Sequence, residues 1–238
     1  MTEFSNISYI NFLKYSGISV FLKEEPNNLY KKNTQKKTSS NITNIENIKN
    51  IEDLKTYFVN FITPILKKRS EHIIFGNGNT NSNIMIIGDP PNDEDEKEGK
   101  FMSGEAGKLL KKMLGAINLE LEAVYLNTII PWKIQKNQEP SNKEILLCLP
   151  FIEKYIELIK PSIILLMGQS ATKGLLTTNL AISELRGKWH EYKSIHTTQT
   201  IKCLVTHDPR LLLKFPNFKR QAWEDLKMIQ QKILDENL

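Results

Sequence analysis

The chain alternates between short apolar runs and longer segments in which apolar residues recur every three or four positions. Runs of branched apolar residues are typical of buried strands, and the longer spacing is typical of amphipathic helices. The strand-like runs are residues 83–88, 123–128, 162–167 and 200–206. The helix-like segments are residues 104–117, 142–159, 169–176 and 218–234. This order predicts an α/β fold, a three-layer α/β/α sandwich around a mainly parallel sheet of about four strands.

The N-terminal part of the chain differs from this pattern in composition. Residues 24–50 are rich in Asn, Lys, Ser and Thr and have few large apolar side chains, so burial cannot offset the entropy lost on ordering. We therefore predict an arm or short helix over residues 1–23, a flexible linker over residues 24–50 and one folded domain over residues 51–238.

Two of the predicted strands end in an aspartate followed by proline. Asp89 comes directly after the run that ends at Gly88, and Asp208 follows His207 after the last predicted strand. Ligands of open α/β sheets bind beyond the carboxyl ends of the strands, so these polar side chains predict a site. Two simpler interpretations remain open: Asp89 can cap its own turn, and His207 with Asp208 can begin a helix.

Composition and charge narrow the function classes. The 238 residues are 40% hydrophobic and 25% charged, which suits one globular domain, and the net charge of +5 suits either a polyanionic partner or an ordinary basic protein. The two cysteines lack metal-ligand spacing, which predicts reduced thiols, a cytoplasmic protein and no metal.

No apolar run approaches the roughly 20 residues that span a bilayer, so we expect no membrane contact. We also expect a monomer. A nucleotide-binding domain unrelated to DNA is disfavoured because the chain has no glycine-rich phosphate loop.

Several blocks of the chain resemble family 4 uracil-DNA glycosylases, in the family's order. Residues 88–95 and 98–110 are similar to the GEAPG-x-EED and GxPFVGxxGxLL blocks, and residues 124–133 to the VYITN…(C/W)RPP segment. Shorter matches follow at residues 137–145, 147–153, 160–161, 167–171, 185–189 and 222–226. The resemblance covers about residues 60–234 and implies the family's fold, DNA as partner, and hydrolysis of the N-glycosidic bond of uracil or another deaminated base.

The resemblance assigns the catalytic positions to Asp89, His207 and Asp208. Asp89 stands where the family has the Glu that activates or orients water, and its side chain is one methylene shorter. Asp208 stands where the family has the His that stabilises charge on the departing base, and His207 precedes it. A carboxylate at this position would repel a uracil anion unless it is protonated.

The implied base pocket is also altered. Thr128 aligns with the Asn that reads the uracil edge, and Asn127 aligns with the preceding Thr. Met102 aligns with the Phe that stacks on uracil, and Phe101 with the Pro before it. Because side chains alternate along a strand, the exchange at 127 and 128 predicts that the two groups point to opposite faces. The implied pocket residues are Gly88, Pro91, Phe101, Met102, Asn127 and Thr128.

The family's iron-sulfur ligand positions align with Pro64, Lys67, Trp132 and Cys148. One thiol cannot hold a cluster that requires four protein ligands, so we expect no cofactor. A Trp at the third position is compatible with relatives in which packing replaces the metal.

Basic and small residues after the predicted strands are either ordinary solvated charges or a rim that contacts phosphates. The predicted DNA-binding residues are Gly168, Gln169, Ser170, Arg186, Lys188, Arg210 and Lys214. Two functions are compatible with these features. The first is an enzyme that flips a base out of single- or double-stranded DNA and excises it. The second is a glycosylase fold that acts as a nucleic-acid-binding or accessory module without catalysis.

Overall fold

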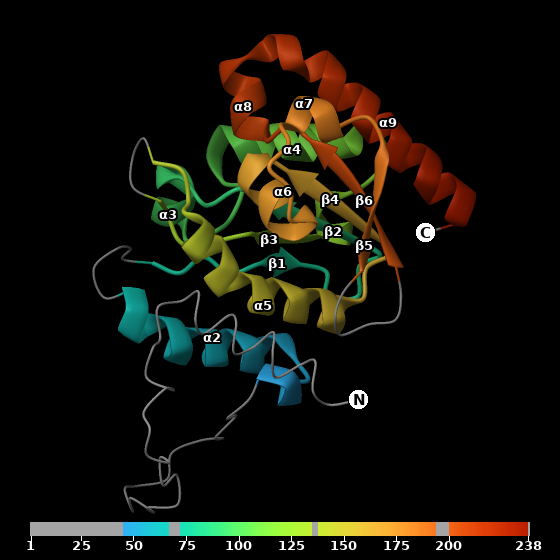
Figure 1. The fold of residues 1–238 in the computed structure, drawn as a ribbon. Helices are drawn as coiled ribbons and strands as arrows, with labels where there is room; N and C mark the ends of the chain where they lie inside the picture. The colour runs from blue at the N-terminus through green and yellow to red at the C-terminus, as the bar shows by residue number, and fades with distance from the viewer. Residues whose placement is uncertain (1–44, 67–71, 135–137, 194–199, 238) are drawn as a thin grey trace, which may run out of the picture.

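The computed structural model describes residues 45–66, 72–134, 138–193 and 200–237, which form a six-stranded sheet between two layers of helices (Figure 1). The strand order is β1-β3-β2-β4-β6-β5. The strands are β1 (Asn77–Gly78), β2 (Ile84–Gly88), β3 (Tyr125–Thr128), β4 (Ile163–Met167), β5 (Trp189–Lys193) and β6 (Thr200–Thr206). The predicted arm over residues 1–23 lies outside the described residues.

The four central strands run parallel, so the predicted α/β fold class is confirmed. All residues of β2, β3 and β4 are buried, which explains why these strands are visible as continuous apolar runs. Two antiparallel strands were not predicted: β1 pairs with β3, and β5 pairs with β6. β1 contains two residues, and β5 is mostly exposed or half-buried, so neither has the apolar run of a central strand.

One face of the sheet is covered by α2 (Ile51–Leu66), α5 (Asn142–Ile159) and α6 (Gln169–Leu176). Figure 1 shows α2 alongside α5, and aromatic rings join the two helices. The ring centroids of Phe58 and Phe151 are 4.5 Å apart in an edge-to-face arrangement. The bounds of α5 and α6 agree with the predicted segments, because both helices have a clear apolar face.

The other face is covered by α4 (Gly104–Gly115) and α9 (Lys219–Glu236). Leu110 and Leu226 from these helices pack with Ile86 and Leu165 of the strands. The short helices are α3 (Asp93–Glu98), α7 (Ile182–Leu185) and α8 (Pro209–Lys214), with 3-10 turns η1 (Ile45–Asn47), η2 (Leu121–Ala123) and η3 (Pro216–Phe218). The start of α8 after Asp208 agrees with the helix start left open for His207 and Asp208. The other short elements were not predicted, since each is too short to show a helical period. Within the described residues, no helix is both long and apolar enough to traverse a bilayer.

The folded domain begins earlier than predicted. Ile48 is only 1% exposed and belongs to the core beneath α2 and α5. The buried ammonium of Lys154 donates a hydrogen bond of 3.2 Å to the carbonyl oxygen of Glu46. Residues 45–50 therefore belong to the domain and correct the predicted linker, whose remaining residues 24–44 lie outside the described part of the chain.

A buried ion pair joins the end of α7 to α9 and β6. The Asp225 carboxylate is fully buried and accepts hydrogen bonds from Arg186 Nε at 3.1 Å and Nη2 at 2.8 Å. Thr206, the last residue of β6, donates to the same carboxylate at 2.8 Å. Buried charges of this kind are tolerated because every oxygen has a donor.

We expect Asp225→Ala to lower the free energy of unfolding by about 3–5 kcal/mol, because the Arg186 guanidinium would keep its burial and lose its counter-charge. Chemical denaturation followed by circular dichroism measures the change. The matched control is Asp235→Ala, on the exposed surface of the same helix, for which we expect less than about 0.5 kcal/mol. Equal effects of the two substitutions would contradict the assigned role.

Candidate active site

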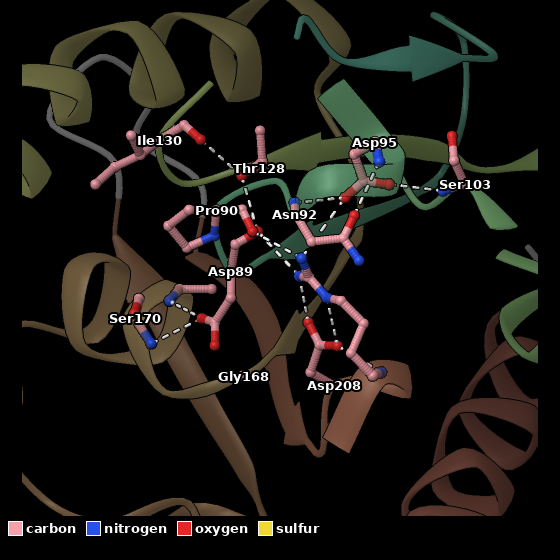
Figure 2. A network of polar contacts seen from close by, with 12 residues as sticks. Asp89, Pro90, Asn92, Asp95, Ser103, Thr128, Ile130, Gly168, Ser170 and Asp208 are labelled. Carbon is pink, nitrogen blue, oxygen red and sulfur yellow. Dashed lines mark hydrogen bonds and ion pairs between the residues drawn. The ribbon is translucent and has the colours of Figure 1, made fainter. Parts of the chain in front are cut away.

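Asp89 lies at the carboxyl end of β2, where its side chain caps the beginning of α6 (Figure 2). Oδ1 accepts hydrogen bonds from the backbone N–H groups of Ser170 at 2.8 Å and Ala171 at 2.9 Å. The carboxylate lies so close to Gly168 that a Cβ atom there would be 2.3 Å from Oδ2. Gly168 also has a φ of +108°, so glycine is required at this position for both reasons.

Burial and, after it, the charge of Asp208 raise the pKa of the Asp89 carboxyl from an ordinary 3.8 to about 7. The two N–H groups of α6 and the Arg210 guanidinium oppose this rise. A carboxyl group with such a pKa exchanges a proton near neutral pH. The hydrogen bonds to Ser170 and Ala171 show that this carboxylate caps the beginning of α6 rather than its own turn.

Arg210 connects Asp89 with Asp208. Its Nε and Nη2 donate to the two oxygens of Asp208 at 2.9 and 2.6 Å, a bidentate pair. Nη1 donates to the carbonyl oxygen of Pro90 at 2.7 Å, and Nη2 to that of Asp89 at 3.2 Å. All three guanidinium nitrogens are thus bound within the chain. In the structure Arg210 thus joins the turn after β2 to the start of α8, whereas its phosphate contact stays a prediction.

A third carboxylate, Asp95, was missed by the sequence analysis. It is 1% exposed, forms a capping box with Asn92 at the start of α3, and accepts the N–H of Ser103 at 2.7 Å. Oδ2 lies 3.6 Å from Arg210 Nη1, and burial raises the pKa of this carboxyl. The spacing of Asn92 and Asp95 is a capping signal that could have placed the helix, although not the contact with Arg210.

The two predicted catalytic residues after β6 point in different directions. Asp208 caps α8, accepting the N–H of Arg210 at 2.7 Å, and its carboxylate faces the site. His207 is 6% exposed and lies against α9: its Nε2 is 2.9 Å from Gln221 Oε1, and its ring centroid is 4.8 Å from that of Phe218. Asp89 and Asp208 therefore share the site, whereas no described contact joins the His207 ring to either.

Gly88, Phe101 and Met102 form one wall of the predicted base pocket. A Cβ atom at Gly88 would lie 2.6 Å from Cζ of Phe101 and 3.3 Å from Cε of Met102. The Phe101 ring is fully buried beneath Arg210, whose guanidinium carbon is 5.9 Å from the ring centroid. Met102 has a φ of +55° and is 5% exposed. Pro91 is buried in the turn before α3.

Thr128 faces the same side of the sheet as Gly88, with which it pairs in register. Its hydroxyl lies 3.0 Å from the carbonyl oxygen of Asp89 and 2.9 Å from that of Ile130 (Figure 2). Thr128 therefore holds the Asp89 backbone from the side opposite to Arg210.

Asn127 lies on the other face of the sheet. It lines a cavity of about 10 Å³ together with residues of α2 and α5, among them Phe58, Cys148 and Tyr155. Its Oδ1 accepts the N–H of Thr128 at 2.9 Å, and its Nδ2 has no hydrogen-bond partner among the described residues. Asn127 and Thr128 thus point to opposite faces of the sheet, as the sequence predicted, and Asn127 lies apart from the other residues implied for the base pocket.

Several predicted DNA-binding side chains are likewise bound within the chain. The amide of Gln169 bonds to the carbonyl oxygen of Leu180 at 2.9 Å and the N–H of Ile182 at 3.2 Å. Arg186 is engaged with Asp225, and the Ser170 N–H is used by Asp89. Lys188 and Lys214 are exposed and remain candidates for phosphate contacts.

The residues at the iron-sulfur positions do not suit a cluster. Cys148 is enclosed in the core, where burial raises the pKa of its thiol well above the ordinary value. Trp132 is 1% exposed and packs near Phe58 with ring centroids 6.4 Å apart. Pro64 lies within α2, and Lys67 lies outside the described residues. One thiol among these side chains supplies too few ligands, and the described residues contain no cluster of three His, Cys, Asp or Glu suited to a metal ion.

Comparisons with known proteins agree with the α/β fold described above. The family model described as the uracil DNA glycosylase superfamily matches residues 75–227. A "Type-4 uracil-DNA glycosylase" of Sulfurisphaera tokodaii is 30% identical over 161 residues, covering 66% of this chain and 72% of the relative. The protein of the same name from Saccharolobus solfataricus is 30% identical over 175 residues, or 71% and 79% of the two chains.

A "DNA polymerase" of Bacillus phage SP01 is also 30% identical, over 165 residues that cover 69% of this chain and 17% of the polymerase. The match to the family model spans both strand ends that carry Asp89 and Asp208, together with the whole parallel sheet. The chain therefore belongs to the uracil DNA glycosylase superfamily.

Proposed function

We propose that this chain hydrolyses the N-glycosidic bond of uracil or another deaminated base in DNA. The observation that carries the proposal is Asp89, a partly buried carboxylate at the end of β2 with a pKa near neutral. The relatives of this chain that are named type-4 uracil-DNA glycosylases support DNA as the substrate class. The base would be extruded from the strand and would lie beside Met102 and Asp89.

Asp89 is suited to activating water. One carboxylate oxygen is held by two N–H groups of α6, which fixes the group's orientation. The ionised carboxylate can accept a proton while the water oxygen forms a bond to C1′ of the sugar. The bond between C1′ and the base nitrogen breaks, and its electron pair leaves with the base.

The pairing of Asp208 with Arg210 bears on the charge of the leaving base. An unpaired carboxylate beside the base would oppose the departure of an anion. Here the Asp208 charge is matched by the bidentate guanidinium of Arg210, whose carbon lies 5.9 Å from the centroid of the Phe101 ring. The arrangement thus weakens the repulsion expected from the sequence.

The second candidate is a glycosylase fold that binds nucleic acid without catalysis. Two features of β3 favour this candidate. The Thr128 hydroxyl on the site face is occupied by backbone carbonyl oxygens, and the Asn127 amide lies on the opposite face of the sheet. The His207 ring bonds to Gln221 and is not directed at Asp89. Neither the Asn127 amide nor the His207 imidazole is therefore placed to read or stabilise a base beside Asp89.

The two candidates differ in turnover. Purified protein should be incubated with oligonucleotides carrying uracil, hypoxanthine or xanthine, single-stranded and paired, and abasic sites should be quantified by alkaline cleavage. We expect excision of at least one base, and Asp89→Asn should reduce the rate by about 10²- to 10⁴-fold, as for loss of a general base.

Asp235→Asn is the control for this substitution, since it makes the same chemical change on the exposed surface of α9 and should leave the rate unchanged. If none of the oligonucleotides yields abasic sites although the protein binds them, the module without catalysis is supported instead.

The excision rate should depend on pH through Asp89. Only the ionised carboxylate accepts a proton, so the rate should rise with pH up to about 7, the pKa of Asp89, and then level off. Single-turnover kinetics across this range measure the profile. A flat profile in the wild-type protein would exclude Asp89 as the base.

Stability should change in the opposite sense. The folded pKa of Asp89 is raised, so the folded protein retains a proton that the unfolded chain releases between about pH 4 and pH 7, and stability falls as pH rises through this window. Asp89→Asn removes this loss, because its amide remains neutral while its oxygen can still accept the N–H groups of α6. A rise of about three pKa units corresponds to about 4 kcal/mol, so we expect Asp89→Asn to be more stable than wild type by up to about 4 kcal/mol at pH 8 and equal to it near pH 4, as measured by urea denaturation. A difference that is independent of pH would contradict the raised pKa.

A further inference from the structure

Exposed aromatic rings and cations gather on one segment, from the end of α8 into α9. Phe215 is 43% exposed and Trp223 is 41% exposed, whereas Trp132 is buried at 1%. The other Phe, Tyr and Trp side chains that the structure describes are buried or half-buried. Exposed cations share the segment: Lys214, Lys219 and Arg220. We call these five side chains the aromatic-basic surface.

This surface begins beside the candidate active site. The Phe215 ring lies 6.4 Å from the Phe218 ring. The Phe218 ring is in turn tilted against that of His207, the neighbour of Asp208, with centroids 4.8 Å apart. The Phe215 N–H bonds to the Leu211 carbonyl oxygen at 2.8 Å and thus closes α8. Figure 1 shows the end of α8 next to the start of α9.

The cations of the surface are available to a ligand. Lys214 Nζ lies 5.4 Å from the centroid of the Phe215 ring, an exposed cation–π contact that leaves the ammonium in solvent. Arg220 Nε is 3.6 Å from Glu224, but its side chain is 89% exposed, and pairs of this kind contribute little. Trp223 follows Lys219 by one helical turn, so the ring and the ammonium share a helix face.

Exposed rings interleaved with cations match the chemistry of single-stranded nucleic acid. Cations bind phosphates of either single or paired strands, whereas an aromatic face stacks on a base only when the base is not already covered by its neighbours. We propose that the aromatic-basic surface binds unpaired bases of single-stranded DNA by stacking on Phe215 and Trp223, with Lys214, Lys219 and Arg220 on the phosphates. This inference takes from the proposed function the choice of DNA as the partner, and it does not depend on base excision.

Uracil-free oligonucleotides test this surface separately from turnover. Fluorescence anisotropy should be used to measure Kd for a labelled single strand and for its duplex at several salt concentrations. We expect Phe215→Ala and Trp223→Ala each to raise Kd for the single strand about tenfold, with little change for the duplex and no change in salt slope. Lys219→Ala with Arg220→Ala should instead lower the single-strand slope by about 1.4, since each cation contributes about 0.7.

Leu234→Ala is the matched control, because Leu234 is an exposed apolar residue at the far end of the same helix, 65% exposed. It should leave Kd unchanged. Circular dichroism checks that each variant is folded, and intrinsic fluorescence gives an independent readout: the single strand should quench emission in wild type and less in Trp223→Phe.

Three outcomes would overturn the inference. The aromatic variants could bind single strands like wild type, they could weaken single strands and duplex alike, or they could abolish a concentration-dependent dimer without affecting DNA, which would identify a protein interface. If the wild-type protein excises bases and the aromatic variants bind single strands unchanged, the stacking inference is wrong and the proposed function stands. If the aromatic variants lose single-strand binding and no excision occurs, the stacking inference stands and the proposed function is wrong.

Discussion

The site depends on one buried guanidinium. Arg210 holds the backbone carbonyls of Asp89 and Pro90 on one side and the Asp208 carboxylate on the other, with Asp95 beside them. A partly buried arginine is stable only when its donors are used, and planar bidentate pairing uses them efficiently. The turn after β2 and the helix after β6 are consequently joined by charge-assisted hydrogen bonds across a large separation in sequence.

This arrangement changes the chemistry expected at Asp208, which aligns with the histidine of the family 4 motifs that the sequence resembles. Asp208 would be an unfavourable neighbour for an anion if it stood alone, but its charge is used to hold Arg210. The nearby Asp89 then experiences burial and a partly compensated negative charge, and its pKa rises toward neutrality. The α6 N–H groups prevent a larger rise and fix the carboxylate's orientation.

Asn127 and Thr128 stand in the reverse order of the Thr-Asn pair that the sequence resembles, and they lie on opposite faces of the sheet. Thr128 supports the Asp89 backbone on the site face, whereas Asn127 extends into a core lined with aromatic rings. That core contains Cys148 and Trp132, which align with two of the iron-sulfur ligand positions implied by the sequence resemblance. Packing of Phe58 against Phe151 and near Trp132 occupies this region.

Local patterns were sufficient to predict much of the fold. The four parallel strands and the bounds of α5 and α6 follow from burial and helical period, and the place of Asp89 and Asp208 at the same ends of parallel strands follows from topology. The edge strands β1 and β5 could not be predicted, because their partners rather than their own side chains define them.

The partners of the charged groups could not be predicted either. The sequence by itself determined the strand-helix order, the acidic strand ends, the opposite facing of Asn127 and Thr128, and the loss of cluster-forming thiols. Only the tertiary structure decided that Arg210 bonds to Pro90, that Arg186 bonds to Asp225, and that His207 turns to Gln221. Burial and backbone period are properties of neighbouring residues, whereas the pairing of a charge depends on which distant segments the fold brings within hydrogen-bonding distance.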